Sequence, residues 1–388
     1  MSEVVAGNRI ELLRAGTEYF PALEAACDAA QREIYLETYI FEDDATGQRI
    51  GAALARAARR GVVVELMIDG FGSKDLGDDF LFALKQAGVR VLIYRPQISP
   101  WTLRRERLRR LHRKIAVIDA KVAFVGGINI IDDMHTPRQV PPRFDYAVRV
   151  EGPLLEPIHA SVVNLWTLVM WTQFRRRGHM QEIPVQAAPC GTRRGAFVVR
   201  DNVRHRNDIE SAYLTAIGQA TREVLIANAY FFPGISFRRA LADATARGVR
   251  VVLLLQGRVE YVLLHYASRA LYRYFLDAGV EIYEYHRSFL HAKVAVVDDR
   301  WSTVGSSNID PMSLLLAREA NVVIDDVDFA RDLKSSLNDA MALGAVRVDE
   351  ATWQRQSLPS RAMTWICYEM VRFLTGWSSY GRAREFIQ

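Results

Sequence analysis

Residues 111–129 read LHRKIAVIDAKVAFVGGIN, and residues 290–308 read LHAKVAVVDDRWSTVGSSN. Each stretch contains a histidine, a lysine two positions later, an aspartate five positions after the lysine, and an asparagine at its end. The offsets from the histidine to the asparagine are identical in the two stretches, which lie about 180 residues apart. Chance does not explain two such matches in one chain, so we infer that the fold contains an internal repeat.

The sequence around the two stretches repeats as well. EIYLETYIF at 33–41 corresponds to EVLIANAYF at 223–231, and each is followed by a helical pattern that ends in Arg-Gly. A buried strand comes next, at 62–70 and at 249–257, and then a second helix that ends at a glycine. This alternation predicts an α/β fold of two α/β/α repeats with largely parallel sheets, packed about a pseudo-two-fold axis.

The repeat divides the chain into four parts. We expect the first half to occupy residues 1–177 and the second half to occupy residues 197–345. Residues 178–196 contain Pro and Gly without apolar periodicity, which is typical of a linker. Residues 346–388 have no counterpart in the first half and predict a C-terminal, amphipathic helical appendage.

The composition is that of a globular protein. Half of the 388 residues are hydrophobic and 24% are charged, which excludes disordered and collagen-like chains. Cys27, Cys190 and Cys367 lack metal-ligand spacing, so we expect unpaired, buried thiols. We find no apolar signal segment and no uncharged apolar run of about 18 residues, so a spanning helix is not expected. The net charge of +5 permits an anionic partner, either a lipid surface or a nucleic acid.

The polar residues of the first stretch alternate with apolar ones. His112 and Lys114 are two positions apart in a predicted strand, so both point to one face, whereas Ile115 and Val117 point to the other. The second stretch has the same pattern. A face with histidine and lysine is costly in a dry interior, so we expect it to line a site that is wet or that binds an anion. By the same parity, the aspartates that close the two motifs face away, and we expect turn or network roles for them.

Both motifs resemble the HKD signature of the phospholipase D superfamily. Within it, the ETYIF, GGIN, GSSN, DYAVRVEGP and NAYFFPG segments resemble the bacterial cardiolipin synthases, over about residues 8–345. The RDN at 200–202 and the lack of a spanning segment near the start of the chain are most similar to the B-type branch. The resemblance implies a duplicated phospholipase D fold and a phosphatidyltransferase that needs no metal or other cofactor.

The residues alone support the chemistry of this family. One imidazole can attack phosphorus and form a phosphohistidine, and a second can protonate the leaving oxygen. Lysines and asparagines can donate to the non-bridging oxygens. The sequence is symmetric as to which histidine is the nucleophile, and the resemblance favours the first. The predicted site residues are His112, Lys114, Asp119, His291, Lys293 and Asp298 in the catalytic motifs, Asn129 and Asn308 at the phosphate, and Asp145 and Glu319 as the acids that orient the histidines.

Two further features extend the prediction. Glu37 ends an early strand, either as a polar residue that lines the site or as a buried structural partner. Residues 101–114, WTLRRERLRRLHRK, carry seven basic residues and one acidic residue, which favours an anionic membrane surface over a solvated loop or a nucleic-acid patch. Residues 161–177, 261–275 and 360–381 are aromatic and apolar, and the last segment predicts an interfacial anchor or a helix docked on the body.

The leading hypothesis is a cardiolipin synthase. It would transfer a phosphatidyl group from one phosphatidylglycerol to the head-group hydroxyl of another, release glycerol, and bind peripherally to the bacterial cytoplasmic membrane. We expect phosphatidylglycerol and other phospholipids as partners, and no nucleic acid. A phospholipase D or nuclease-like hydrolase of the same superfamily and a non-catalytic membrane scaffold are the alternatives. The acceptor alcohol, a phosphatidylethanolamine donor and the oligomeric state stay open.

Overall fold

The computed structural model describes residues 3–95, 109–136, 140–173, 183–201, 204–258, 262–310, 317–349, 363–371 and 373. Its strands are β1 (Val5–Arg14), β2 (Glu33–Thr38), β3 (Val63–Asp69), β4 (Arg90–Tyr94), β5 (Arg110–Leu111), β6 (Lys114–Ile118), β7 (Val122–Gly126), β8 (Tyr146–Glu151), β9 (Arg193–Arg200), β10 (Glu223–Asn228), β11 (Arg250–Gln256), β12 (Glu281–Tyr285), β13 (Lys293–Val297), β14 (Trp301–Gly305), β15 (Ala317–Asp325) and β16 (Ala345–Val348). Its helices are α1 (Ala15–Ala29), α2 (Ala45–Arg59), α3 (Asp78–Gln86), α4 (Leu155–Thr172), α5 (Asp208–Gln219), α6 (Ile235–Ala246), α7 (Val262–Arg269), α8 (Tyr272–Asp277) and α10 (Val327–Gly344).

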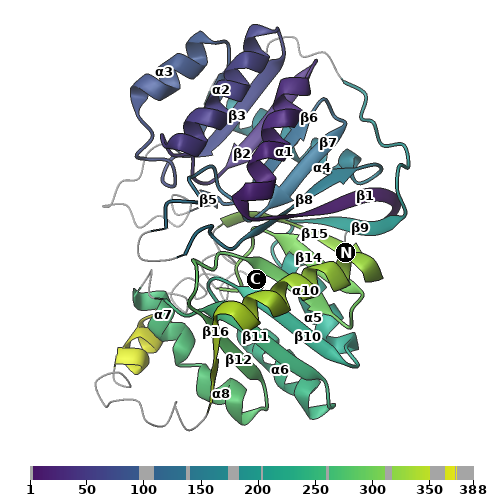
Figure 1. The fold of residues 1–388 in the computed structure, drawn as a ribbon, viewed down its shortest axis with the longest axis vertical. Helices are drawn as coiled ribbons and strands as arrows, with labels where there is room; N and C mark the ends of the chain where they lie inside the picture. Colours follow the sequence, from purple (N-terminus) through teal and green to yellow (C-terminus); the bar gives the residue numbers. More distant parts are fainter. Residues whose placement is uncertain are drawn as a thin grey trace, which may run out of the picture.

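The strand order is symmetric about the middle of one continuous sheet. Outward from the junction, the first half runs β1-β8-β7-β6-β2-β3-β4 and the second runs β9-β15-β14-β13-β10-β11-β12, followed by β16. The two halves join where β1 pairs with β9 antiparallel. Figure 1 shows the halves stacked along the long axis of the molecule, with these two strands between them. The predicted pair of α/β repeats about a pseudo-two-fold axis is therefore confirmed.

The expectation of largely parallel sheets is wrong. Among the described strands, the parallel runs within each half are β2-β3-β4 and β10-β11-β12, and the motif strands are antiparallel to their neighbours. The reason is the short turn after each motif strand. Residues 119–121 join β6 to β7, with Asp119 and Ala120 at φ 53° and 49°. A turn this short can only close an antiparallel hairpin.

Three apolar cores hold the helices against the sheet. In the first half, α1, α2 and α3 pack on one face through residues such as Leu23 and Leu54. In the second half, α5, α6, α7 and α8 pack on the corresponding face through residues such as Leu241 and Phe275. The third core lies on the opposite face, includes α4 and α10, and contains strands of both halves. Because this core is shared, the two halves bury one continuous interior.

Segment boundaries differ slightly from those expected. Strand β9 begins at Arg193, inside the segment 178–196, and residues 346–348 belong to β16, which pairs with β12. The three cysteines are unpaired, but the expectation of burial is wrong for Cys190, which is exposed. Within the described ranges, no helix combines the length and apolar character needed to span a bilayer.

Candidate active site

Each motif histidine is held by backbone of the opposite half. The amide of His112, which lies between β5 and β6, donates to the carbonyl of Arg318 at 3.0 Å. The amide of His291, just before β13, donates to the carbonyl of Phe144 at 2.8 Å. Strand β5 also pairs with β15 of the second half. The two motifs therefore meet at the junction of the halves.

The carboxylates at the two rings are exchanged between the halves. His112 Nδ1 lies 3.0 Å from Glu319 Oε1, and His291 Nδ1 lies 2.6 Å from Asp145 Oδ2. Arg318 and Phe144, which hold the histidine backbones, immediately precede these two acids in the chain. The sequence offsets did not reveal this exchange. With each Nδ1 beside a carboxylate, Nε2 is the ring nitrogen left for chemistry.

The two motif lysines are buried beside the histidines. Lys114 Nζ donates to the carbonyl of His112 at 2.6 Å and lies 5.3 Å from the centre of the Tyr39 ring. Lys293 Nζ lies 2.7 Å from His291 Nδ1 and 3.5 Å from the Asp145 carboxylate. Burial and the nearby charge of Lys293 lower the pKa of Lys114 to about 7. The lysines of the two halves are therefore close enough to repel each other.

Burial also governs the protonation of the histidines. It lowers the pKa of His112, against the opposing charge of Glu319. Burial and the charge of Lys293 lower the pKa of His291 to about 3. Both shifts favour the neutral form of the ring in the free protein. A neutral imidazole keeps the lone pair that a nucleophile or a general base needs.

The two asparagines are buried at the same edge of the sheet. The Asn129 side-chain oxygen accepts from the Ile40 amide at 3.1 Å, which fixes the orientation of its amide group. The side-chain oxygen of Asn308 has no hydrogen-bond partner among the described residues. The amide of Ile309 instead donates to Asn228 at 3.3 Å. Both asparagines thus remain candidates for contact with a phosphate.

The motif aspartates do not join this group. Asp119 accepts from the backbone amides of Gln31, Arg32 and Glu33 at 2.7–3.0 Å, in the turn that leads into β2. Asp298 accepts in the same way from residues 221–223, at 2.8–2.9 Å. Burial alone would raise the pKa of Asp298, but these backbone N–H groups lower it. Both carboxylates bind a hairpin turn to the preceding helix–strand connection, which is a structural role away from the histidines.

Glu37 is a buried structural partner. Its carboxylate accepts two hydrogen bonds from the Arg113 guanidinium, which also donates to Ser161 on α4. Arg113 and Lys114 both belong to the basic run at 101–114. The structure buries both side chains, so neither offers charge to a membrane surface. Residues 101–108 of that run lie outside the described residues.

Two contacts at the acids were not predicted from the sequence. Ser306 Oγ donates to Glu319 at 2.5 Å. At the equivalent position of the first half, a Cβ on Gly127 would lie 2.4 Å from the Asp145 carboxylate, so only glycine fits there. The sequence contains a hint of this difference between the halves. The turn before the aspartate reads GGIN, with glycine at 127, and the turn before the glutamate reads GSSN, with serine at 306.

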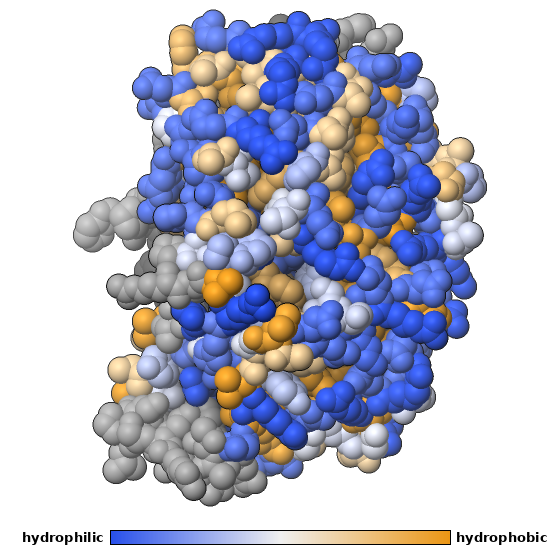
Figure 2. Space-filling model, viewed as in Figure 1, coloured by the Kyte–Doolittle hydropathy of each residue, from blue (hydrophilic) through white to orange (hydrophobic). Residues whose placement is uncertain are grey.

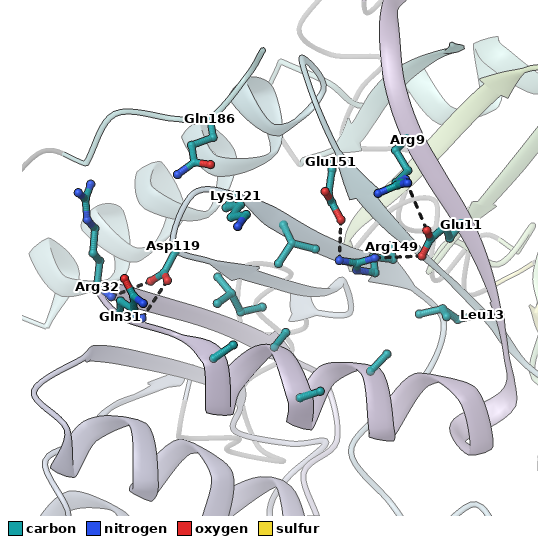
Figure 3. A pocket seen from close by; sticks show the side chains of 16 residues that line it. Arg9, Glu11, Leu13, Gln31, Arg32, Asp119, Lys121, Arg149, Glu151 and Gln186 are labelled. Atoms are coloured by element: carbon teal, nitrogen blue, oxygen red, sulfur yellow. Dashed lines mark hydrogen bonds and ion pairs between the residues drawn. The ribbon is translucent and has the colours of Figure 1, made fainter. Parts of the chain in front are cut away.

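A separate cavity of about 750 Å³ lies beside α1 in the first half (Figure 3). Its rim includes Arg149, which is ion-paired with Glu11 at 3.1 Å and with Glu151 at 2.5 Å. None of the motif histidines or lysines lines it. The described residues contain no group of three or more His, Cys, Asp or Glu side chains that could hold a metal ion.

The chain is similar in sequence to known proteins over most of its length. A family model described as "Cardiolipin synthase, PLD-like domain" matches residues 23–138 and 213–341. Cardiolipin synthase B of Escherichia coli K12 and that of Shigella flexneri are each 42% identical over 96% of this chain and 90% of their own length. Cardiolipin synthase 1 of Bacillus anthracis is 28% identical over 91% of this chain and 70% of its own length.

A solved structure shows the same fold at low identity. Phosphatidylserine synthase of Haemophilus influenzae superposes with a TM-score of 0.70 over 94% of this chain and 93% of its own, at 13% identity. The family model covers both halves and the B-type relatives cover nearly the whole chain. The chain therefore belongs to the phospholipase D-like cardiolipin synthase family.

Proposed function

We propose that this chain makes cardiolipin from two molecules of phosphatidylglycerol through a phosphohistidine on His112. The observation that carries the proposal is the pair of buried histidines, each with Nδ1 beside an acid of the other half and with a buried lysine next to it. Such a site offers a nucleophile, an acid–base group and positive charge at one phosphodiester.

In the first step, His112 Nε2 attacks the phosphorus of one phosphatidylglycerol. The P–N bond forms as the P–O bond to the glycerol head group breaks, and His291 gives its proton to the leaving oxygen. The charge of the bound phosphodiester raises the pKa of His291 above its value in the free site, so the ring takes up from solvent the proton that it then gives to the leaving oxygen. Glu319 and Asp145 orient the two rings through Nδ1.

In the second step, the head-group hydroxyl of another phosphatidylglycerol attacks the same phosphorus. His291 takes the hydroxyl proton, and the P–N bond to His112 breaks as the new P–O bond forms. Lys114, Lys293 and the two buried asparagines, Asn129 and Asn308, donate to the non-bridging oxygens, where negative charge concentrates. The cycle consumes no external acid or base.

The family is membrane-associated, and we propose peripheral binding to the anionic surface of the bacterial cytoplasmic membrane. The substrates support this location, because both phosphatidylglycerol molecules are anchored in the bilayer by their acyl chains. A phospholipid surface is consistent with the net charge of +5. A nucleic acid is not part of the proposal.

The test is product identity. The purified protein is incubated with phosphatidylglycerol in mixed micelles that contain EDTA, and the lipids and free glycerol are quantified. We expect cardiolipin and glycerol in equal amounts, and neither product from the His112→Ala and His291→Ala variants. Formation of phosphatidic acid alone would replace the synthase with a phospholipase D-type hydrolase.

A further inference from the structure

Residues 363–371 form a helix that docks on the second half by one face. Thr364, Cys367 and Val371 are buried in this contact, and Cys367 and Val371 belong to the same apolar core as α7. The ring of Tyr368 lies 5.7 Å from the ring of Phe232. The side chains that dock the helix therefore recur at the three- and four-residue spacing of one helical face.

The outward face of this helix is also largely apolar, with the half-buried Glu369 as its charged residue among those described. Its large side chains are exposed by 45% to 70% of their surface, and they are Met363, Trp365, Ile366, Met370 and Phe373. Single exposed apolar residues are ordinary on a soluble protein, but a contiguous group of this kind marks an interaction surface. In Figure 2, apolar side chains emerge at the lower left, where Figure 1 draws this helix in yellow.

The helix sits at the catalytic edge of the sheet. Its contact residue Phe232 follows the end of β10, where Asn228 pairs with Lys293. The Phe232 amide donates to the carbonyl of Ile309 at 2.7 Å, one residue after Asn308. The loop under the helix is thus bonded to the candidate phosphate-binding turn.

We propose that this outward face inserts into the headgroup–acyl boundary of a phospholipid bilayer and presents the active site to lipid phosphates. Residues 363–371, the described part of the helix, are too few to span a bilayer, and we place this part in the plane of the membrane. Tryptophan among aliphatic and sulfur-containing side chains is typical of such interfaces. The choice of a lipid rather than a protein as the partner rests on the proposed function.

The test uses Trp365→Ser/Ile366→Ser/Phe373→Ser in the full chain. Its binding to vesicles of phosphatidylglycerol and phosphatidylethanolamine (1:3) is measured by co-sedimentation at 0.1 M and 0.5 M NaCl. We expect about 100-fold weaker partitioning at both salt concentrations, because apolar burial is lost rather than charge. A matched control, Phe82→Ser/Leu343→Ser, removes side chains of similar exposure, 62% and 66%, and should bind as the wild type does.

A second readout locates the helix directly. Vesicles with brominated acyl chains should quench part of the tryptophan fluorescence, and Trp365→Phe should abolish that part while binding is retained. Vesicle binding of the triple variant equal to that of the wild type, or an equal loss in the control, would overturn the proposal. The proposal would also be overturned if the wild type formed a dimer that the triple substitution disrupted while vesicle binding persisted.

The proposed function can fail separately. Binding is measured without turnover, so a protein that binds through this face but makes no cardiolipin would refute the transferase and leave the surface intact. Conversely, the triple variant should keep its activity on short-chain phosphatidylglycerol dispersed in detergent.

Discussion

The two halves carry the same catalytic motif, but different side chains pack behind it. In the first half, Arg113 follows His112 and forms a buried ion pair with Glu37. In the second half, the equivalent positions are Ala292 and Ala227, so the charged pair is replaced by two small apolar residues. The two halves therefore share the histidine, lysine and asparagine of the motif and differ in the layer of side chains behind them.

The acids differ in the same way. Asp145 accepts from its own neighbour, the Tyr146 amide, at 2.8 Å and lies beside Lys293. Glu319 instead accepts from the Ser306 hydroxyl. Symmetric motif residues therefore occupy unequal electrostatic settings, which allows one histidine to be the nucleophile and the other to be the acid and base.

The largest effect should come from the histidines. His112→Ala and His291→Ala should each lower turnover by about 10³-fold or more, because the nucleophile and the acid act in series. With a phosphatidyl substrate whose leaving group needs no proton, the His291→Ala variant should still accumulate an acid-labile phosphoryl-enzyme, detected by labelling and peptide mapping. Label on His291 in the His112→Ala variant would reverse the assignment.

The exchanged acids sharpen this comparison. Asp145→Asn and Glu319→Gln should each lower turnover by about 100-fold, because each ring loses the group that fixes its tautomer. With the same activated substrate, Asp145→Asn should retain the phosphoryl-enzyme burst, as His291→Ala does, and Glu319→Gln should lose it. If instead Asp145→Asn abolished the burst, each acid would serve the histidine of its own half.

Substitutions in the buried ion pair test whether the first half depends on the charges that the second half lacks. Glu37→Ala should lower the free energy of unfolding by about 3–5 kcal/mol, because it leaves the Arg113 charge buried without a partner. The double variant Glu37→Ala/Arg113→Ala copies the second half and should recover about half of that loss. Urea denaturation measures both. If the double variant lost as much free energy of unfolding as Glu37→Ala and Arg113→Ala lose in sum, the first half would require charge at this point.

The smallest effect concerns pH. The pKa of Lys114 is about 7, so its positive charge is present below that pH and is lost as the pH rises through it. We expect kcat/KM to fall about fivefold between pH 7 and pH 8 as this phosphate donor loses its charge. Lys114→Arg keeps the charge and should flatten that part of the profile. An unchanged profile in this variant would assign the decline to another group.

Much of the site could be found from the sequence. The doubled His-Lys pattern identified the strand face, and strand parity alone separated Asp119 and Asp298 from the histidines. The short turns around those aspartates also implied hairpins, which contradict the expectation of parallel sheets. Glu37 could not be placed, because its partner Arg113 lies 76 positions away on another strand.

The sequence by itself determined the repeat, the strand face that carries the histidines and lysines, and the family, because these depend on local spacing that both copies preserve. Only the tertiary structure decided which acid serves which histidine. His112 and Glu319 are 207 positions apart, and His291 and Asp145 are 146 apart, so neither pair leaves a local pattern. The exchange follows from the pseudo-two-fold junction, where β5 pairs with β15 beside His112 and Glu319, and Phe144 bridges to Leu290 beside Asp145 and His291.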